Sequence, residues 1–267
     1  MNALNNFLFV VYPYICLAVF LMGSLARFDR DQYTWKSDSS QLLRGRSLKW
    51  ASNLFHAGIL FLFVGHTVGM LTPHGLYEHF ITPAQKQLLA VVAGGVAGTI
   101  CFIGLTGLIW RRVSDARVRL TSHRTDLAIL LILWLQLSLG LITLPYSLSH
   151  SDGSVMLILS DWAQRIVTLN PDASALAAIA WPYKVHMVLG MTIFLLFPFS
   201  RLVHVWSGLA SVAYLLRPYQ IVRSRRLNLP AERRPAAGQA HKPAARQPET
   251  TRAPLLGAQR ATQRGHQ

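Results

Sequence analysis

Five apolar stretches of helical length restrict what this chain can fold into more than any other feature of its sequence. Each has about 20 residues or more, enough for an α-helix to cross a hydrocarbon core of about 30 Å. They occupy residues 4–28, 50–71, 88–110, 127–148 and 183–206. Only 14% of the 267 residues are charged, whereas soluble domains contain roughly a quarter. The sequence therefore predicts an all-α, polytopic membrane protein with five transmembrane helices.

Two apolar segments, residues 4–28 and residues 155–169, could be mistaken for a signal peptide and for a further transmembrane helix. The stretch over residues 4–28 lacks the positively charged start and the small-residue cleavage site of a signal peptide, so we expect it to remain as a transmembrane helix. Residues 155–169 are also apolar, but Asp161, Gln164 and Arg165 interrupt them and the segment is too short to span a bilayer. We expect this segment to lie flat at the membrane interface.

Basic residues concentrate in the loops on one side of the predicted bundle. Residues 27–49 contain six Lys or Arg and residues 111–124 contain five, whereas the loops on the other side contain few. Cytoplasmic loops of membrane proteins carry this excess of positive charge. The sequence therefore predicts that the N-terminus lies outside and the C-terminus in the cytoplasm.

The net charge of +15 comes largely from the end of the chain. Residues 217–267 contain eleven Lys or Arg against two acidic residues, which argues against a basic globular surface for nucleic acid. From residue 227 onward Pro, Ala and Arg dominate, and too few large apolar residues remain to form a core. We expect a five-helix membrane domain over residues 1–226 and a disordered, Pro/Ala/Arg-rich cytoplasmic tail over residues 227–267.

Four of the ten histidines lie inside the apolar stretches, where a polar side chain is costly and calls for a function. His56 and His66 lie in the second stretch, and His186 and His204 in the fifth, which runs in the opposite direction. Similar depth pairs His56 with His204 on the inner side and His66 with His186 on the outer side. Facing neutral imidazoles are axial ligands of b-type haem iron, so the sequence predicts two bis-histidine haems.

The spacing of the four histidines conflicts with a pair of straight helices. His56 and His66 are ten residues apart, a rise of about 15 Å, whereas His186 and His204 are eighteen apart, a rise of about 27 Å. Helix tilt, inclined macrocycles and a bend at Pro198 could each absorb the difference. Small residues lie nearby, at Gly58, Gly65, Gly69 and Gly190. They would let a flat macrocycle approach the backbone, or they serve ordinary packing of transmembrane helices.

Several long motifs resemble one protein family. They are VYPYICLAVFLMGS, QYTWKSDSSQLL, SNLFHAGILFLFVGH, GMLTPH, HMVLGMTIFLLFPFSRLVHVWS and YQIVRSR, in this order within residues 1–226. Together they resemble the gamma subunit of membrane-bound respiratory nitrate reductase, its dihaem cytochrome b. The resemblance implies that His56, His66, His186 and His204 are the haem ligands. It also implies a bacterial cytoplasmic (inner) membrane, a cytoplasmic iron–sulfur beta subunit and a molybdenum-containing alpha subunit that reduces nitrate.

Basic residues near the predicted haems have two interpretations each. Lys86, at the start of the third apolar stretch, is either a snorkelling interface anchor or a partner for a quinol hydroxyl. The family pattern has a lysine here at its quinol site, which favours the second role. Arg111, Arg112 and Arg201 lie at the cytoplasmic edge, where they either pair with haem propionates or simply follow the positive-inside rule.

These features predict a membrane anchor that oxidises a quinol, ubiquinol or menaquinol, near the outer face. Its electrons would pass inward through two haems to the iron–sulfur subunit, with protons released outside. A cytochrome b of a hydrogenase or a formate dehydrogenase is an alternative within the same chemistry. A transporter or proton channel that uses its histidines as proton relays is an alternative from another class.

Overall fold

The computed structural model describes residues 3–30, 45–120 and 122–207, and within them every regular element is a helix. Five of these helical segments are long and apolar enough to cross a membrane. They are Ala3–Arg30, Leu48–Leu71, Pro83–Ser114, Arg124–Ser149 and Trp181–Phe199. The prediction of an all-α protein with five candidate transmembrane helices is confirmed. The predicted tail and the end of the membrane domain lie outside the described residues.

The first span is a helix with an irregular turn near its start. It comprises α1 (Ala3–Asn6), a π-helical turn (Phe7–Val11) and α2 (Tyr12–Arg30). Widened turns of this kind release backbone carbonyls from the regular i to i−4 pattern. The Trp162 indole donates a hydrogen bond to the Phe9 carbonyl at 2.9 Å, which links this turn to a helix far along the chain.

The second and third spans pack closely through glycines. Helix α3 (Gly45–Leu71) is followed by the short α4 (His74–Tyr77) and by α5 (Pro83–Ser114). A methyl group on Gly104 would lie 2.4 Å from the Phe55 nitrogen, and one on Gly58 would lie 2.6 Å from the Cys101 Cβ. Of the two roles open to Gly58, the structure favours helix packing, because this residue lets α3 approach α5.

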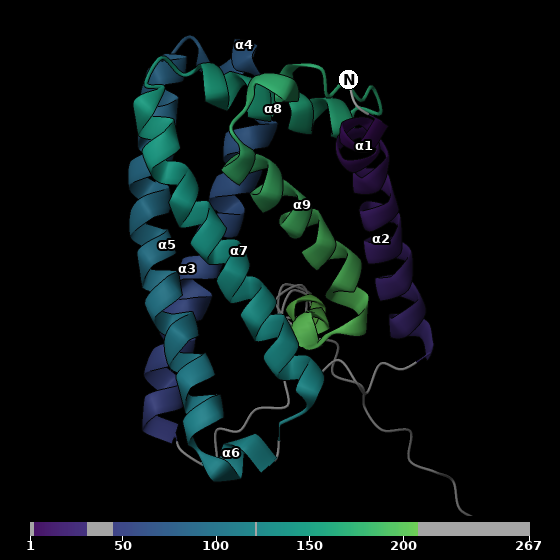
Figure 1. The fold of residues 1–267 in the computed structure, drawn as a ribbon, viewed down its shortest axis with the longest axis vertical. Helices are drawn as coiled ribbons and strands as arrows, with labels where there is room; N and C mark the ends of the chain where they lie inside the picture. The colour runs from purple at the N-terminus through teal and green to yellow at the C-terminus, as the bar shows by residue number, and fades with distance from the viewer. Residues whose placement is uncertain (1–2, 31–44, 121, 208–267) are drawn as a thin grey trace, which may run out of the picture. The chain divides into compact units, whose positions relative to one another are not determined.

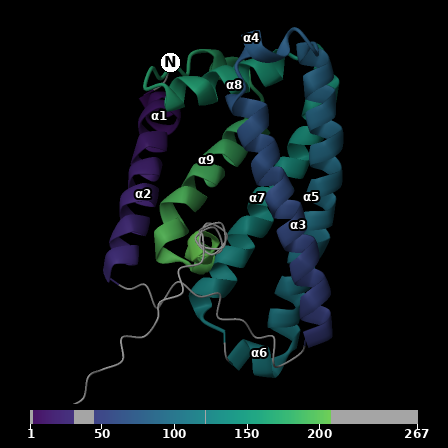
Figure 2. The same cartoon turned by 180° about the vertical axis from the view of Figure 1, so that it is seen from behind.

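The fourth span is followed by a helix that lies across one end of the bundle (Figure 1). Helix α6 (Ala116–Leu120) precedes α7 (Arg124–Ser149), and α8 (Ser154–Val167) follows it. The α8 end of the bundle contains α1, α4 and α8, and the α6 end is opposite (Figures 1 and 2). Helix α8 buries Ser160, Trp162 and Ile166. The segment expected to lie flat at the interface is therefore a helix, and it packs on α3 and α5.

The fifth span is interrupted, which corrects the prediction of one helix over residues 183–206. After a short 3₁₀ turn (Ala175–Ala178), helix α9 (Trp181–Leu196) ends in 3₁₀ turns at Phe197–Phe199 and Arg201–Val203. Pro198 has no N–H to continue the helix, and Ser200 adopts an extended conformation with φ −118° and ψ 175°. The rise of about 27 Å for an unbroken helix therefore does not apply between His186 and His204.

An arginine on the first span holds this interruption. Arg27 donates to the Pro198 carbonyl at 2.7 Å and to the Ser200 carbonyl at 2.9 Å. Gly23, one turn earlier, brings α2 so close to Pro198 that an added methyl group would lie 2.8 Å from the proline ring. Helix α2 thus satisfies backbone carbonyls that lose their helical partners where α9 ends.

The spans form a row in which α2 packs on α9, α9 on α7, α7 on α5 and α5 on α3 (Figures 1 and 2). The other main neighbour of α3 is α8. The two segments that carry the four membrane histidines, α3 and α9 with its continuation, therefore lie at separate places in this row.

Candidate cofactor site

Two pairs of imidazole rings bridge α3 and the fifth span. The ring centroids of His56 and His204 are 6.2 Å apart with an interplanar angle of 74°. Those of His66 and His186 are 6.3 Å apart with an angle of 41°. The structure brings together the same partners that similar membrane depth suggests. The break after α9 makes this possible, because it lets the chain change direction before His204.

The separation within each pair suits one iron atom between two rings. An imidazole nitrogen binds a metal at about 2.0 Å and lies about 1 Å from its ring centroid, so two axial imidazoles have centroids about 6 Å apart. The observed 6.2 and 6.3 Å agree with this distance.

Hydrogen bonds at Nδ1 determine which ring nitrogen is available to a metal. Each of the four Nδ1 atoms lies within hydrogen-bond distance of a backbone carbonyl, which can only accept. The acceptors are Ser52 for His56 (2.7 Å), Leu62 for His66 (2.7 Å), Gln136 for His186 (3.1 Å) and Arg201 for His204 (2.7 Å). Nδ1 is therefore the protonated nitrogen, and Nε2 is the nitrogen that can bind iron. At His186 the Gln136 amide nitrogen lies 3.4 Å from Nε2, so this amide would have to give way to iron.

The remaining donors near the two pairs fit haem and not a bare metal ion. Within the described residues, no group of three or more His, Cys, Asp or Glu side chains could hold a metal. A haem needs only two protein ligands here, since its macrocycle supplies the other nitrogens. A methyl group on Gly65, next to His66, would have no described atom within 4 Å, which leaves room beside that ring.

The other two glycines expected near a macrocycle have protein neighbours. A methyl group on Gly69 would lie 3.5 Å from the Met156 side chain, and one on Gly190 would lie 3.1 Å from the Gln136 amide nitrogen. Gln136 was not singled out from the sequence. The available signal was its position as a polar residue in the middle of the fourth apolar stretch.

Lys86 is buried in the first turn of α5, at the α8 end of the bundle where α3 ends after His66. Its side chain is 7% exposed, and Nζ lies 3.7 Å from the centroid of the Tyr77 ring. Neither Nζ nor the Tyr77 hydroxyl has a hydrogen-bond partner among the described residues. A snorkelling anchor extends its ammonium into water, so this placement favours a ligand-binding role.

Tyr77 is a further candidate that the sequence interpretation missed. Burial raises the pKa of its hydroxyl above the usual value, and the neighbouring Glu78 adds a smaller increase. The hydroxyl therefore stays protonated at neutral pH and can donate a hydrogen bond. No motif distinguishes Tyr77 from the other aromatic residues of the chain, and only its contact with Lys86 identifies it.

Two of the three predicted arginines, Arg112 and Arg201, form a charge cluster with Asp126 near the α6 end. Asp126, in the first turn of α7, lies 3.3 Å from Arg112 and 3.4 Å from Arg201. Arg111 precedes Arg112 in the last turn of α5 and is buried. Asp126 was also missed, although it is the acidic residue that opens an apolar stretch. The cluster reaches the His56/His204 pair, because the Arg201 carbonyl accepts from His204.

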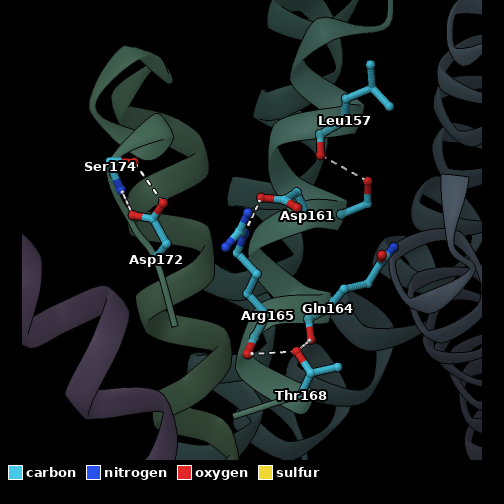
Figure 3. A network of polar contacts seen from close by, with 8 residues as sticks. Leu157, Asp161, Gln164, Arg165, Thr168, Asp172 and Ser174 are labelled. Atoms are coloured by element: carbon cyan, nitrogen blue, oxygen red, sulfur yellow. Dashed lines mark hydrogen bonds and ion pairs between the residues drawn. The ribbon is translucent and has the colours of Figure 1, made fainter. Parts of the chain in front are cut away.

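Helix α8 contacts the end of α3 through Gln164, whose position among the other polar residues of α8 is seen in Figure 3. The Gln164 amide donates to the carbonyls of Met70 and Thr72, which lack helical partners where α3 ends. On the exposed side Arg165 pairs with Asp161 at 2.7 Å, as Figure 3 shows. Of the three polar residues that interrupt this apolar segment, Gln164 thus attaches α8 to α3, and Asp161 and Arg165 pair with each other on its exposed side.

Comparisons with known proteins show which family this chain resembles. The family model described as nitrate reductase gamma subunit matches residues 5–225. The chain is 53% identical over 224 residues to the respiratory nitrate reductase 2 gamma chain of Escherichia coli K12, covering 84% of this chain and 98% of that one. It is 51% identical over 226 residues to the respiratory nitrate reductase 1 gamma chain of the same organism, covering 84% and 100%. The nitrate reductase gamma chain of Bacillus subtilis 168 is 35% identical over 222 residues, covering 83% and 99%.

Proposed function

This chain belongs to the nitrate reductase gamma subunit family, and from that premise we propose that it is the quinol-oxidising, dihaem cytochrome b subunit of a respiratory nitrate reductase. It would anchor the complex in a bacterial cytoplasmic (inner) membrane. Electrons from quinol would pass through two b haems to a cytoplasmic iron–sulfur beta subunit, and then to the molybdenum-containing alpha subunit. Family membership favours this role over a hydrogenase or formate dehydrogenase cytochrome b.

The observation that carries the proposal is the geometry of the two histidine pairs. Their centroid distances of 6.2 and 6.3 Å suit two axial imidazoles, and all four Nδ1 atoms donate to backbone carbonyls. These histidines differ from isolated core histidines because they form two facing pairs between two membrane segments. Bound haem would supply a one-electron carrier at each pair, alternating between ferric and ferrous iron. Arg111, Arg112 and Arg201 are the proposed partners of haem propionates, and Arg112 and Arg201 also pair with Asp126.

Lys86 is the residue that we assign to quinol. Oxidation of a quinol to a quinone releases two electrons and two protons. The buried ammonium of Lys86 can donate a hydrogen bond to a quinol oxygen and stabilise the negative charge that develops as the hydroxyl loses its proton. The Tyr77 ring beneath Nζ keeps the ammonium within the protein. Either ubiquinol or menaquinol presents the oxygen that this group requires.

Visible difference spectra of membranes that contain the assembled complex test the proposal. We expect two b-type components in the wild type, loss of one in His66→Ala or His186→Ala, and loss of the other in His56→Ala or His204→Ala. His123→Ala is the matched control, because this exposed histidine at the start of α7 lies outside both pairs and should keep both components.

Two results would contradict the assignment. Absence of any b-type signal from the wild-type complex would support a histidine-relay transporter. Loss of both components from His66→Ala, with the protein still inserted in the membrane, would show that the pairs are not independent sites. Co-purification of an iron–sulfur protein and a molybdenum protein tests the partners separately.

A further inference from the structure

We infer that α7 positions the His186 imidazole, through the backbone carbonyl of Gln136 and through the close approach of the ring that Gly140 permits. This inference rests on the proposed role of His186 as a haem ligand. Gly140 is then a positioning residue. Helix α7 carries none of the four histidines but contributes to the His66/His186 site.

The hydrogen bond of His186 differs from those of the other three histidines. His56, His66 and His204 donate to carbonyls three or four residues earlier in their own segments. His186 donates to Gln136, fifty residues earlier and on a different helix. The orientation of this one ring therefore depends on how α7 and α9 pack against each other.

Gly140 explains why the Gln136 carbonyl can accept a second hydrogen bond. In an α-helix the carbonyl of residue 136 accepts from the N–H of residue 140, and its other lone pair stays available. A side chain at residue 140 lies on the same face as residue 136 and would cover the approach to that oxygen. With glycine at this position, the His186 ring reaches the carbonyl.

The distances show how little space remains. A methyl group on Gly140 would lie 3.0 Å from His186 Cε1, 3.6 Å from Nδ1 and 3.7 Å from Nε2. Ordinary carbon contacts are about 3.5–4.0 Å, so the ring would have to move away by several tenths of an ångström. The hydrogen bond from Nδ1 to the Gln136 oxygen is already 3.1 Å, the longest of the four, and this movement would weaken it.

A second glycine completes the crossing of α7 and α9. Gly190 lies four residues after His186 on α9, and a methyl group there would lie 3.1 Å from the Gln136 amide nitrogen. Each helix thus has a glycine opposite the polar side chain of the other, Gly140 opposite His186 and Gly190 opposite Gln136. The two side chains also meet, with the Gln136 amide nitrogen 3.4 Å from His186 Nε2. This reciprocal arrangement holds the imidazole between two backbones and restricts its rotation.

The electron paramagnetic resonance spectrum of the oxidised complex tests this inference, because the low-spin ferric signal depends on the orientation of the two axial imidazole planes. We expect Gly140→Ala to shift the signal of the His66/His186 haem and to reduce its retention about tenfold, as loss of a ligand's hydrogen-bond partner commonly does. Gly140→Val should have a larger effect. The signal of the His56/His204 haem should not change.

Gly94→Ala is the matched control, because this glycine lies in the transmembrane helix α5 and a methyl group there would have no described atom within 4 Å. Alanine is a better helix former than glycine, so neither change weakens its own helix. A Gly140→Ala complex with the spectrum of the Gly94→Ala complex would overturn the inference. Equal changes at both haems would also overturn it, since they would indicate a general distortion.

The His186→Ala complex separates this inference from the proposed function. Retention of both haems in His186→Ala would refute the assigned ligand, and with it the basis for Gly140. Loss of one haem in His186→Ala, together with a normal Gly140→Ala spectrum, would leave the ligand assignment intact and remove only the positioning role.

Discussion

At the scale of single residues, variants of Lys86 and Tyr77 test the quinol proposal most directly. Both are buried, both lack a hydrogen-bond partner in the described chain, and the ammonium lies 3.7 Å from the ring centroid. A desolvated cation–π contact is worth about 2 kcal/mol. The ring therefore contributes to holding the charge where a ligand can reach it.

Variants of Tyr77 separate the ring from the hydroxyl. Tyr77→Leu removes the contact with Lys86 and should raise the KM for a quinol analogue about tenfold, whereas Tyr77→Phe keeps the ring and should have a smaller effect. Lys86→Ala should slow quinol oxidation further, with both haems present. Steady-state kinetics with haem-normalised complexes measure these effects. Unchanged kinetics in Lys86→Ala would show that Lys86 is an interface anchor and does not bind quinol.

Residue types and spacing were sufficient to predict the four histidines, because a polar side chain inside an apolar helix is visible in the sequence alone. Asp126, Gln136, Gly140 and Tyr77 were not predicted. Their roles depend on neighbours that are distant in sequence, such as the fifty residues between Gln136 and His186. No local pattern encodes such a contact, so it becomes visible only when the helices are packed.

At the scale of secondary-structure elements, the end of α9 determines where His204 lies. The sequence predicts the positions of all five spans, since length and apolarity are local properties. It also marks Pro198 as a bend. The extent of the break depends on Arg27, because two carbonyls that have left the helix need donors and the arginine comes from another span. That contact joins residues more than 170 positions apart.

Removal of this donor should disturb one histidine pair selectively. Arg27→Gln would leave the Pro198 and Ser200 carbonyls without the guanidinium, at a cost of about 1.5–3 kcal/mol for a hydrogen bond to a charged group. We expect weaker retention of the haem at His56/His204, measured by visible spectra during thermal denaturation, and a normal His66/His186 haem. Arg30→Gln on the same helix, an exposed site, controls for the lost positive charge. Equal behaviour of the two variants would contradict the structural role of Arg27.

At the scale of the whole molecule, the two histidine pairs divide the bundle along its length. His66 lies towards the α8 end together with Lys86, and His204 follows α9 beside the charge cluster of Asp126. The basic loops place the α6 end in the cytoplasm, if the positive-inside rule holds for this chain. The quinol site would then face the outside, and the cytoplasmic subunits would meet the opposite end.

This arrangement predicts that turnover separates charge across the membrane. Quinol oxidation at Lys86 would release two protons outside, while its two electrons move inward from the His66/His186 pair to the His56/His204 pair. Moving one charge against 100 mV stores about 2.3 kcal/mol, which a quinol site on the cytoplasmic side would not do. Intact cells or right-side-out vesicles supplied with a reduced quinol analogue and nitrate should acidify the medium, and an uncoupler should abolish the gradient. Lys86→Ala should lower the rate of acidification in proportion to quinol oxidation. Proton release on the cytoplasmic side alone would show that quinol binds at the α6 end, and would require another group in place of Lys86.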